Sequence, residues 1–254
     1  MLFTTSWDDG YTLDLKVGEM LKAHGATGTF YICPVQQHGQ RMMSETQIRE
    51  LGATHEIGAH SLTHRWLTHV SAEEKHREIA GSKAWVEQIT GKPCAMFCYP
   101  FGDHDDDVTE EVQDAGFAGA RTVEDLQFSS SNRFTIPTSL QISHFPWRRR
   151  WSRWWHPFDP LGPLRARWSR LRALGVPLSA CGSWLSLATH LFHWSLDTNQ
   201  PFFHLWGHSA EIEKYGMWED LEVFLRIVHD AGDNIQHVTN CEIVNAPKKQ
   251  IPKK

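Results

Sequence analysis

The sequence predicts an α/β protein built as a distorted (β/α) barrel of about seven parallel strands, carrying a largely helical insertion. Short apolar runs alternate with stretches of helical period, which is the pattern of repeated strand–helix units and a parallel sheet. The chain has 254 residues, a length that suits one barrel-sized domain. About seven or eight candidate strands in that length favour a TIM-like barrel, complete or distorted, over a doubly wound sheet.

The candidate strands are short, rich in apolar or β-branched residues, and bounded by glycine, proline or polar residues. They cover residues 2–6, 27–33, 55–59, 95–99, 117–120, 134–142, 202–206 and 234–238. Pro137 interrupts the sixth of them, because proline has no N–H to donate to a neighbouring strand.

The candidate helices follow the strands and carry apolar residues on one face. They cover residues 13–24, 44–51, 71–89, 107–115 and 218–231. The longest has a predicted capping box, Ser71 with Glu74, at its start and Gly91 beyond its end. No repeat of fixed period and no low-complexity linker is visible. We therefore expect a single domain over residues 1–254, with an insertion near residues 143–200.

Composition excludes several classes of protein. The formal charge of −5 and a pI near 6.3 give no general attraction for nucleic acid. The five cysteines are scattered without a Cys-x-x-Cys pair, which favours a reducing compartment. No basic leader precedes the first motif, and no run of about 18 apolar residues exists, so the sequence predicts a cytoplasmic location without a membrane span.

Polar residues suited to chemistry fall just after candidate strands. Asp8 and Asp9 follow the first strand, His60 and His64 the third, residues 100–102 the fourth, and His208 a later one. Active sites of (β/α) barrels lie at the carboxyl ends of the strands. These sequence-distant groups are therefore expected to converge on one face.

The histidine pair His60 and His64 means little alone. With 16 histidines, roughly one His-x-x-x-His pair is expected by chance, and His204 and His208 form a second one. Either pair could be a surface or a core pair. If residues 60–64 make a helical turn, both rings can reach one cation, and a carboxylate from another strand end would complete a His-His-Asp set.

Asp8 and Asp9 offer that carboxylate. Two carboxylates before Gly10 also suit a solvated turn that caps the next helix. Against that interpretation, adjacent residues point in different directions. One carboxylate can then bind a metal while its neighbour acts as a base, a division of labour that suits hydrolysis.

Three segments together resemble a known family. Residues 6–10 (SWDDG), 60–64 (HSLTH) and 99–102 (YPFG) are similar, in order and separation, to the first three motifs of the polysaccharide deacetylase family, also called the NodB-homology domain. The resemblance covers residues 1 to about 122 and resumes at 203–225. It implies a hydrolase of carbohydrate metabolism, with a distorted barrel and a divalent metal that is often zinc, which removes acetyl groups from N-acetylated sugars.

The resemblance also implies residue roles. Asp9, His60 and His64 would bind the metal, Asp8 would be the base that deprotonates the attacking water, and His208 would be the general acid that protonates the departing amine. The backbone N–H of Phe101 would stabilise the oxyanion. Expected substrate-binding residues are Tyr99, Pro100 and Trp206.

The chain departs from the family pattern at three places. Cys98 stands where family members carry an arginine that supports the base. The fourth motif has no clear counterpart, although Asp125 lies in that part of the chain. His204 competes with His208 as the acid, and His208 is favoured because it follows the strand end, with Glu211 close enough to orient it.

The insertion contains an unusual stretch, residues 146–172, with eight arginines, five tryptophans and a single acid, Asp159. Three interpretations stay open. The tryptophans could cap the barrel core beneath a solvated arginine face. They could instead stack on sugar rings, or insert with the arginines into an anionic membrane surface. The last interpretation would suit a lipid-linked amino sugar at the inner face of a membrane.

Two further functions compete with sugar deacetylation. Relatives on the same barrel hydrolyse cyclic amides or ureides, often with altered metal motifs, and the intact Asp9, His60 and His64 set disfavours that reaction. A glycan- or membrane-binding relative without catalysis is suggested by Cys98 and the arginine–tryptophan stretch, but such a protein would have little reason to keep Asp8.

Overall fold

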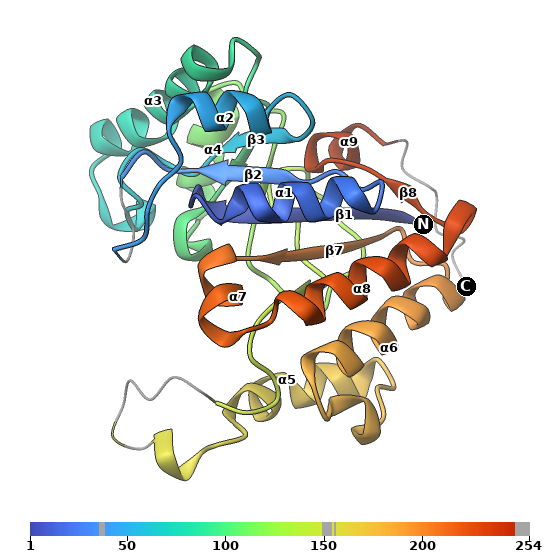
Figure 1. The fold of residues 1–254 in the computed structure, drawn as a ribbon. Coiled ribbons are helices and arrows are strands. Elements are labelled where there is room, and N and C mark those ends of the chain that lie inside the picture. Colours follow the sequence, from blue (N-terminus) through green and yellow to red (C-terminus); the bar gives the residue numbers. More distant parts are fainter. Residues whose placement is uncertain (36–38, 149–153, 155, 247–254) are drawn as a thin grey trace.

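The computed structural model describes residues 1–35, 39–148, 154 and 156–246, and in them strands and helices alternate along the chain (Figure 1). The strands pair in parallel throughout. They are β1 (Leu2–Asp9), β2 (Thr29–Ile32), β3 (Glu56–Ala59), β4 (Met96–Cys98), β5 (Gly119–Arg121), β6 (Leu140–Gln141), β7 (Phe202–Gly207) and β8 (Gln236–His237).

Helices flank the sheet: in the view of Figure 1, α2 and α3 lie above it, α1 lies in front of β1 and β2, and α6 and α8 lie below β7. The helices are α1 (Asp14–Ala23), α2 (Glu45–Leu51), α3 (Ala72–Thr90), α4 (Asp106–Asp114), α5 (Gly162–Ala173), α6 (Trp184–Asp197), α7 (Ser209–Tyr215), α8 (Trp218–Asp230) and α9 (Asn240–Asn245). Short 3₁₀ turns occur at Leu67–His69, Pro100–Gly102, His156–Phe158, Leu178–Cys181 and Gly232–Asn234.

The sheet curls into the predicted distorted barrel. Its strand order is β5-β4-β3-β2-β1-β7-β6, and β8 pairs with the beginning of β1. Residues 136–142 join its two edges, because Ile136 bridges Arg121 of β5 and the N–H of Ile142 donates to the carbonyl of Trp206 in β7. The predicted fold class is confirmed.

The predicted ends of the longest helix are confirmed in part. The Ser71 hydroxyl accepts a hydrogen bond from the N–H of Glu74, and Gly91 ends α3 with φ of 66°. Glycine populates that left-handed region without the steric penalty of a side chain. The Glu74 carboxylate lies near Arg65 and Arg77 instead of closing the predicted capping box.

Two layers of side chains hold the sheet in place. Between β1, β7 and the helices α6 and α8, an aromatic cluster of Phe3, Phe203, Phe192 and Phe224 is fully buried. Each buried phenylalanine contributes about 1.5–3 kcal/mol through removal of apolar area from water. A second, smaller cluster, which includes Tyr31 of β2 and Met96 of β4, fills the interior of the barrel.

Three predicted elements differ from the structure. The first strand continues to Asp9, so Asp8 and Asp9 are its last residues and not part of the following loop. The predicted strand 134–142 contains only the two residues of β6, because Pro137 interrupts pairing. The predicted strand 234–238 contains only the two residues of β8.

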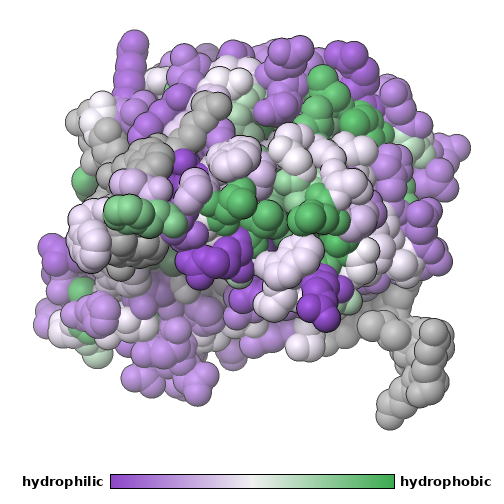
Figure 2. Space-filling view, turned by 90° about the horizontal axis from the view of Figure 1, so that it is seen from below, coloured by the Kyte–Doolittle hydropathy of each residue, from purple (hydrophilic) through white to green (hydrophobic). Residues whose placement is uncertain are grey.

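The insertion near 143–200 is largely helical, as predicted, and contains α5 and α6. Asp125 fastens α5 to the barrel, since its carboxylate lies 2.5 Å from Arg167 Nε and 2.6 Å from Arg170 Nη1. Seen from below, hydrophobic residues gather in the middle of the face and hydrophilic residues surround them (Figure 2). Of the arginine–tryptophan stretch, residues 149–153 and 155 lie outside the described residues.

No helix in the described part of the chain is both long enough and apolar enough to cross a membrane.

Candidate metal centre and active site

The strand register brings the predicted site residues to one level of the barrel. Asp9 of β1 pairs with Ile32 of β2, and Ile32 pairs with Ala59 of β3, the residue before His60. On the other side of β1, Trp7 pairs with Gly207, the residue before His208. Because all of these strands run parallel, their carboxyl ends form the face that the sequence predicts for the chemistry.

Asp9, His60 and His64 form a compact donor set. Asp9 Oδ1 lies 3.7 Å from His60 Nε2 and 3.4 Å from His64 Nε2, and the three donor atoms lie within 4.8 Å of one another. Asp9 is 3% exposed, and its Oδ1 has no hydrogen-bond partner among the described residues. One carboxylate with two imidazoles is a typical donor set for a divalent cation such as zinc.

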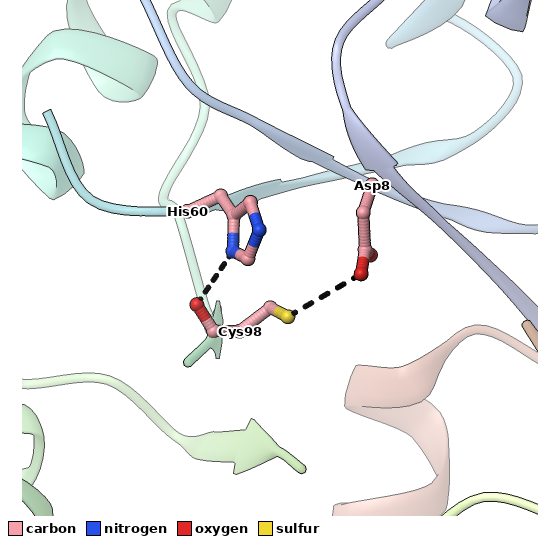
Figure 3. Close-up of side chains that lie close together, drawn as sticks. All are labelled: Asp8, His60 and Cys98. Atoms are coloured by element: carbon pink, nitrogen blue, oxygen red, sulfur yellow. Dashed lines mark hydrogen bonds between the residues drawn. The ribbon is translucent and has the colours of Figure 1, made fainter. Parts of the chain in front are cut away.

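A hydrogen bond from the ring nitrogen that faces away from Asp9 fixes the orientation of His60. Its Nδ1 donates to the carbonyl of Cys98 at 2.7 Å, so that the Nε2 lone pair remains available toward Asp9. Figure 3 shows this bond and the Cys98 thiol directed at Asp8. Burial lowers the pKa of His60 to about 4, which keeps the ring neutral near pH 7, the state that binds metal.

A second group of possible ligand atoms comprises Asp8, His60 and Cys98. This set suits a metal less well. Burial raises the pKa of the Cys98 thiol, and the thiol donates to Asp8 Oδ2 at 3.8 Å. A protonated thiol that is already a donor is a poor ligand, because metals bind the thiolate.

The side chains of Asp8 and Asp9 have different partners. Asp8 is 2% exposed and forms a charged hydrogen bond with Nη2 of Arg121, which is itself fully buried. Burial acts to raise the pKa of Asp8, but the charge of Arg121, its hydrogen bond to Asp8 and the charge of His208 outweigh burial and lower the pKa. Asp8 is therefore an ionised carboxylate held beside the donor set and not within it.

Arg121 is the functional residue that sequence reasoning missed. In the register of the sheet it pairs with Cys98, so an arginine one strand away occupies the space beside Asp8 that the family arginine was expected to fill. Its guanidinium also lies over the rings of Tyr31 and Trp206, at 5.2 Å and 4.8 Å. The available signal was an arginine at the very end of an apolar strand, residues 117–120.

The loop after β3 does not make the predicted helical turn. Ser61 and His64 both have positive φ, 59° and 55°, and the Ser61 hydroxyl accepts from the N–H of His64. The carboxylate of Glu78 in α3 accepts from the N–H groups of Leu62 and Thr63 at 2.9 Å and 2.7 Å. A strained loop anchored to a helix therefore brings the two rings together.

Strain recurs around the site. Asp9 and Phe101 have φ of 82° and 60°, values that residues with a side chain rarely adopt. Such conformations persist only where the surrounding structure enforces them, and they concentrate at functional sites. Tyr11 helps to enforce the Asp9 geometry, because its hydroxyl donates to Asp9 Oδ2 at 2.6 Å.

The two candidate acids lie in different environments. His204 is fully buried within β7, where Nε2 contacts the Ser6 hydroxyl at 2.8 Å and Nδ1 lies 3.2 Å from the carbonyl of Pro137. His208 follows the end of β7, with Nε2 3.9 Å from Asp9 Oδ2 and Nδ1 3.6 Å from Glu211. The structure thus puts His208 beside the donor set and His204 in the core.

The charge of His208 suits an acid. Burial alone would lower its pKa, but contact with Glu211 and the charges of Asp8 and Asp9 raise it to about 9. The ring therefore carries a proton at neutral pH. His204, in contrast, is neutral, because burial and the Arg121 charge lower its pKa to about 3.

The expected substrate contacts differ in their exposure. Tyr99 is fully buried in the core, and its hydroxyl donates to the carbonyl of Phe134. Its side chain is therefore not accessible to a substrate. Pro100 is buried as well. Trp206 is 6% exposed at the floor of the site, between Arg121 and His208. Phe101 is 47% exposed and packs against the His64 ring.

Comparison with known proteins agrees with this geometry. Residues 2–120 match the family model described as polysaccharide deacetylase. Residues 2–120, just under half of the chain, are therefore similar to polysaccharide deacetylases. The peptidoglycan-N-acetylmuramic acid deacetylase of Bacillus subtilis (strain 168) is 31% identical over 102 residues. That match covers 39% of this chain and 36% of the relative, so the chain spans only about a third of the curated protein it matches.

Solved structures resemble the whole described fold. A family 4 acetyl xylan esterase from Clostridium thermocellum, in complex with a cobalt ion, has a TM-score of 0.58 at 15% identity, over 96% of this chain and 91% of that one. A mutant CE4 family pseudoenzyme with restored enzymatic activity has a TM-score of 0.57 at 15% identity, over 96% and 67%. At such low identity these likenesses establish the fold alone.

Proposed function

We propose that this protein is a metal-dependent amide hydrolase that removes N-acetyl groups from an amino sugar of a polysaccharide, an oligosaccharide or a lipid-linked glycan, giving acetate and a free amine. One observation carries the proposal. Two neighbouring buried carboxylates have separate surroundings, since Asp9 faces His60 and His64 while Asp8 is held by Arg121. That separation is what hydrolysis by a metal and a general base requires.

The donor set fits a divalent cation. Asp9 Oδ1 is a buried carboxylate oxygen without a hydrogen-bond partner in the described chain, and it lies between two imidazole nitrogens. Such an oxygen is costly to bury unless a ligand satisfies it. Asp9, His60 and His64 would hold the ion, and we propose zinc as its identity because of the nitrogen and oxygen donors. When bound, the metal would supply Lewis acidity that polarises the acetyl carbonyl and lowers the pKa of water.

The remaining side chains have distinct tasks in this proposal. Asp8, kept ionised by Arg121, accepts the proton of the attacking water. The N–H of Phe101, in the turn after β4, donates to the oxygen that gains negative charge. His208, protonated at neutral pH, transfers its proton to the departing nitrogen, and Glu211 keeps the ring in position.

Two other functions compete with deacetylation: hydrolysis of a cyclic amide or ureide, and binding without catalysis. Hydrolysis of a cyclic amide or ureide is disfavoured by the intact Asp9, His60 and His64 set, and an assay on both kinds of amide separates the two reactions. A binding protein without catalysis would need neither the Asp8–Arg121 pair nor a protonated His208 beside it. The retention of both supports an active enzyme.

The test is metal analysis of the purified protein together with acetate release from N-acetylglucosamine oligomers, for wild type and Asp8→Asn. We expect bound divalent metal in both proteins and a loss of about 10²–10⁴-fold in kcat for the variant, the usual contribution of a general base. A cyclic amide is assayed in parallel.

Retention of metal in Asp8→Asn serves as the control, because Asp8 lies outside the proposed ligand set. Absence of metal from every preparation, or activity that Asp8→Asn leaves unchanged, would overturn the proposal. Hydrolysis of the cyclic amide alone would replace it with the alternative reaction.

A further inference from the structure

A pocket lies at the carboxyl ends of β6 and β7, the face that also carries Asp9 and His208, between the insertion and the helices α7 and α8. It has a volume of about 330 Å³. His144 and Trp147 reach it from the segment after β6, and Trp184 from the start of α6. Tyr215, at the end of α7, and Asp220 of α8 also line it.

The position of this pocket relative to the centre follows from α7. His208 is the residue at which that helix begins, and Tyr215 is its last residue. At a rise of about 1.5 Å per residue, the pocket wall lies roughly 10 Å along the helix from His208. Because β6 and β7 are parallel neighbours, the segment after β6 emerges beside His208. A chain-like ligand could therefore reach both places at once.

Several aromatic side chains line the pocket, among them Trp147, Trp184 and Tyr215. Trp184 is the floor, 2% exposed, with its Nε1 donating to the carbonyl of Gln141 at 2.8 Å. Tyr215 and His144 form one wall with ring centroids 5.7 Å apart. Trp147 stands at the rim and is 54% exposed. A fixed floor with an exposed aromatic rim offers flat apolar faces to a ligand.

Polar groups are interspersed among the rings. Asp220 lies at the pocket, and its carboxylate interacts electrostatically with His144. The Ser183 hydroxyl accepts from the N–H of Ser186 and so keeps its own proton free to donate. The pocket thus presents acceptors and donors together with aromatic faces, and the Asp220 carboxylate disfavours phosphate or another anion.

A sugar ring fits this combination best. Its C–H faces pack on aromatic rings, and its hydroxyl groups both donate and accept hydrogen bonds. The volume is also at the lower end of the range usual for small-molecule sites, about 300–1,000 Å³.

We infer that this pocket binds a sugar unit of the same glycan whose acetyl group is removed at the metal centre, so that the preferred substrate is an oligosaccharide or polymer and not a single sugar. The inference rests on the proposed function for the identity of that glycan. It gives the insertion a role, because Trp147, Ser183 and Trp184 all belong to it.

The experiment compares wild type with Trp147→Ala and Tyr215→Ala. Acetate release is measured on N-acetylglucosamine and on its pentamer. We expect each variant to raise KM for the pentamer about tenfold, with kcat and all constants for the single sugar unchanged. Trp154→Ala is the matched control, because Trp154 is also an insertion tryptophan, is 84% exposed, and does not line the pocket.

A binding measurement separates this inference from the proposed function. Calorimetry with the pentamer on an Asp8→Asn background needs no turnover, and Trp147→Ala on that background should weaken binding about tenfold. If the Asp8→Asn protein binds the pentamer and Trp147→Ala weakens that binding, but wild type releases no acetate, the sugar-binding pocket is supported and the proposed deacetylation is overturned. If Trp147→Ala and Tyr215→Ala release acetate from the pentamer and bind it as well as the control Trp154→Ala does, the inferred sugar-binding pocket is overturned.

Discussion

Arg121 keeps Asp8 ionised inside the barrel. Both side chains are almost completely removed from water, and an isolated carboxylate in that position would take up a proton. The guanidinium compensates for lost hydration by a direct charged hydrogen bond, and it is supported in turn by the ring of Trp206. Asp8, the proposed base, and Arg121 come from β1 and β5, strands that are far apart in the chain.

The partnership predicts the effect of removing the charge. In Arg121→Met the pKa of Asp8 rises, so the carboxylate stays protonated to higher pH. The acid limb of the pH dependence of kcat/KM is therefore expected to move to higher pH, and kcat at pH 7 to fall about 10²-fold. The measurement is a pH–rate profile of the metal-loaded enzymes.

A second variant, Arg121→Lys, separates the effect of the lost charge from the effect of lost stability. Removing one partner of a buried ion pair costs about 3–5 kcal/mol, so Arg121→Met is expected to have a lowered Tm. Arg121→Lys keeps the charge and should keep the acid limb closer to that of wild type. Identical pH profiles for wild type and Arg121→Met would contradict the assigned role of Arg121.

At the scale of elements, the insertion has two parts with different contacts. Helix α5 is fixed to the barrel through Asp125, which pairs with Arg167 and Arg170. The segment before it carries large aromatic groups in water, since Trp154 is 84% and Phe158 is 83% exposed. Exposed aromatic side chains next to many arginines are the composition of surfaces that bind anionic membranes.

We propose on this basis that the insertion makes a peripheral contact with an anionic membrane surface. The protein is expected to co-sediment with phosphatidylglycerol vesicles at low salt, not with neutral vesicles, and to dissociate as ionic strength rises. Trp154→Ala combined with Phe158→Ala should reduce the bound fraction several-fold. Trp66→Ala, which removes a half-exposed tryptophan outside the insertion, is the control. No sedimentation with anionic vesicles at low salt would refute the contact.

In the molecule as a whole, local signals predicted the fold and brought together most residues of the candidate site. Ser71 and Gly91 mark the ends of α3 because caps depend on neighbouring residues alone. Asp9, His60, His64 and His208 converge because parallel strands end on one face. Each of these inferences needs only the order of the elements, which alternating apolar and helical patterns reveal.

The remaining features depend on register and on long-range packing. Arg121 reaches Asp8 because Cys98 and Arg121 are paired across β4 and β5, and no sequence spacing encodes that pairing. The positive φ of His64 depends on Glu78, which lies in α3 and anchors the loop from outside it. Tyr99 belongs to a site motif in the sequence, but its ring is directed into the core by strand alternation.

The proposed metal centre predicts that bound metal raises the stability of the fold. Metal that binds the native state alone stabilises it by about 2.7 kcal/mol at a free concentration one hundred times Kd. For a chain of this size, that corresponds to an increase in Tm of roughly 5–10 °C. Removing the metal with a chelator is therefore expected to lower Tm by about this amount, as measured by circular dichroism, and zinc should restore it.

His64→Gln tests whether the stabilisation comes from this site. The variant loses one imidazole at the edge of the site, where the side chain is 8% exposed, and should unfold at nearly the same temperature with and without chelator. In this variant and in chelator-treated wild type alike, Asp9 is a buried carboxylate without the positive charge of the metal. The two proteins should therefore have similar Tm values. A metal-dependent rise in Tm of equal size in His64→Gln would place the ion elsewhere, and no rise in wild type with any divalent metal would contradict a metal centre at Asp9.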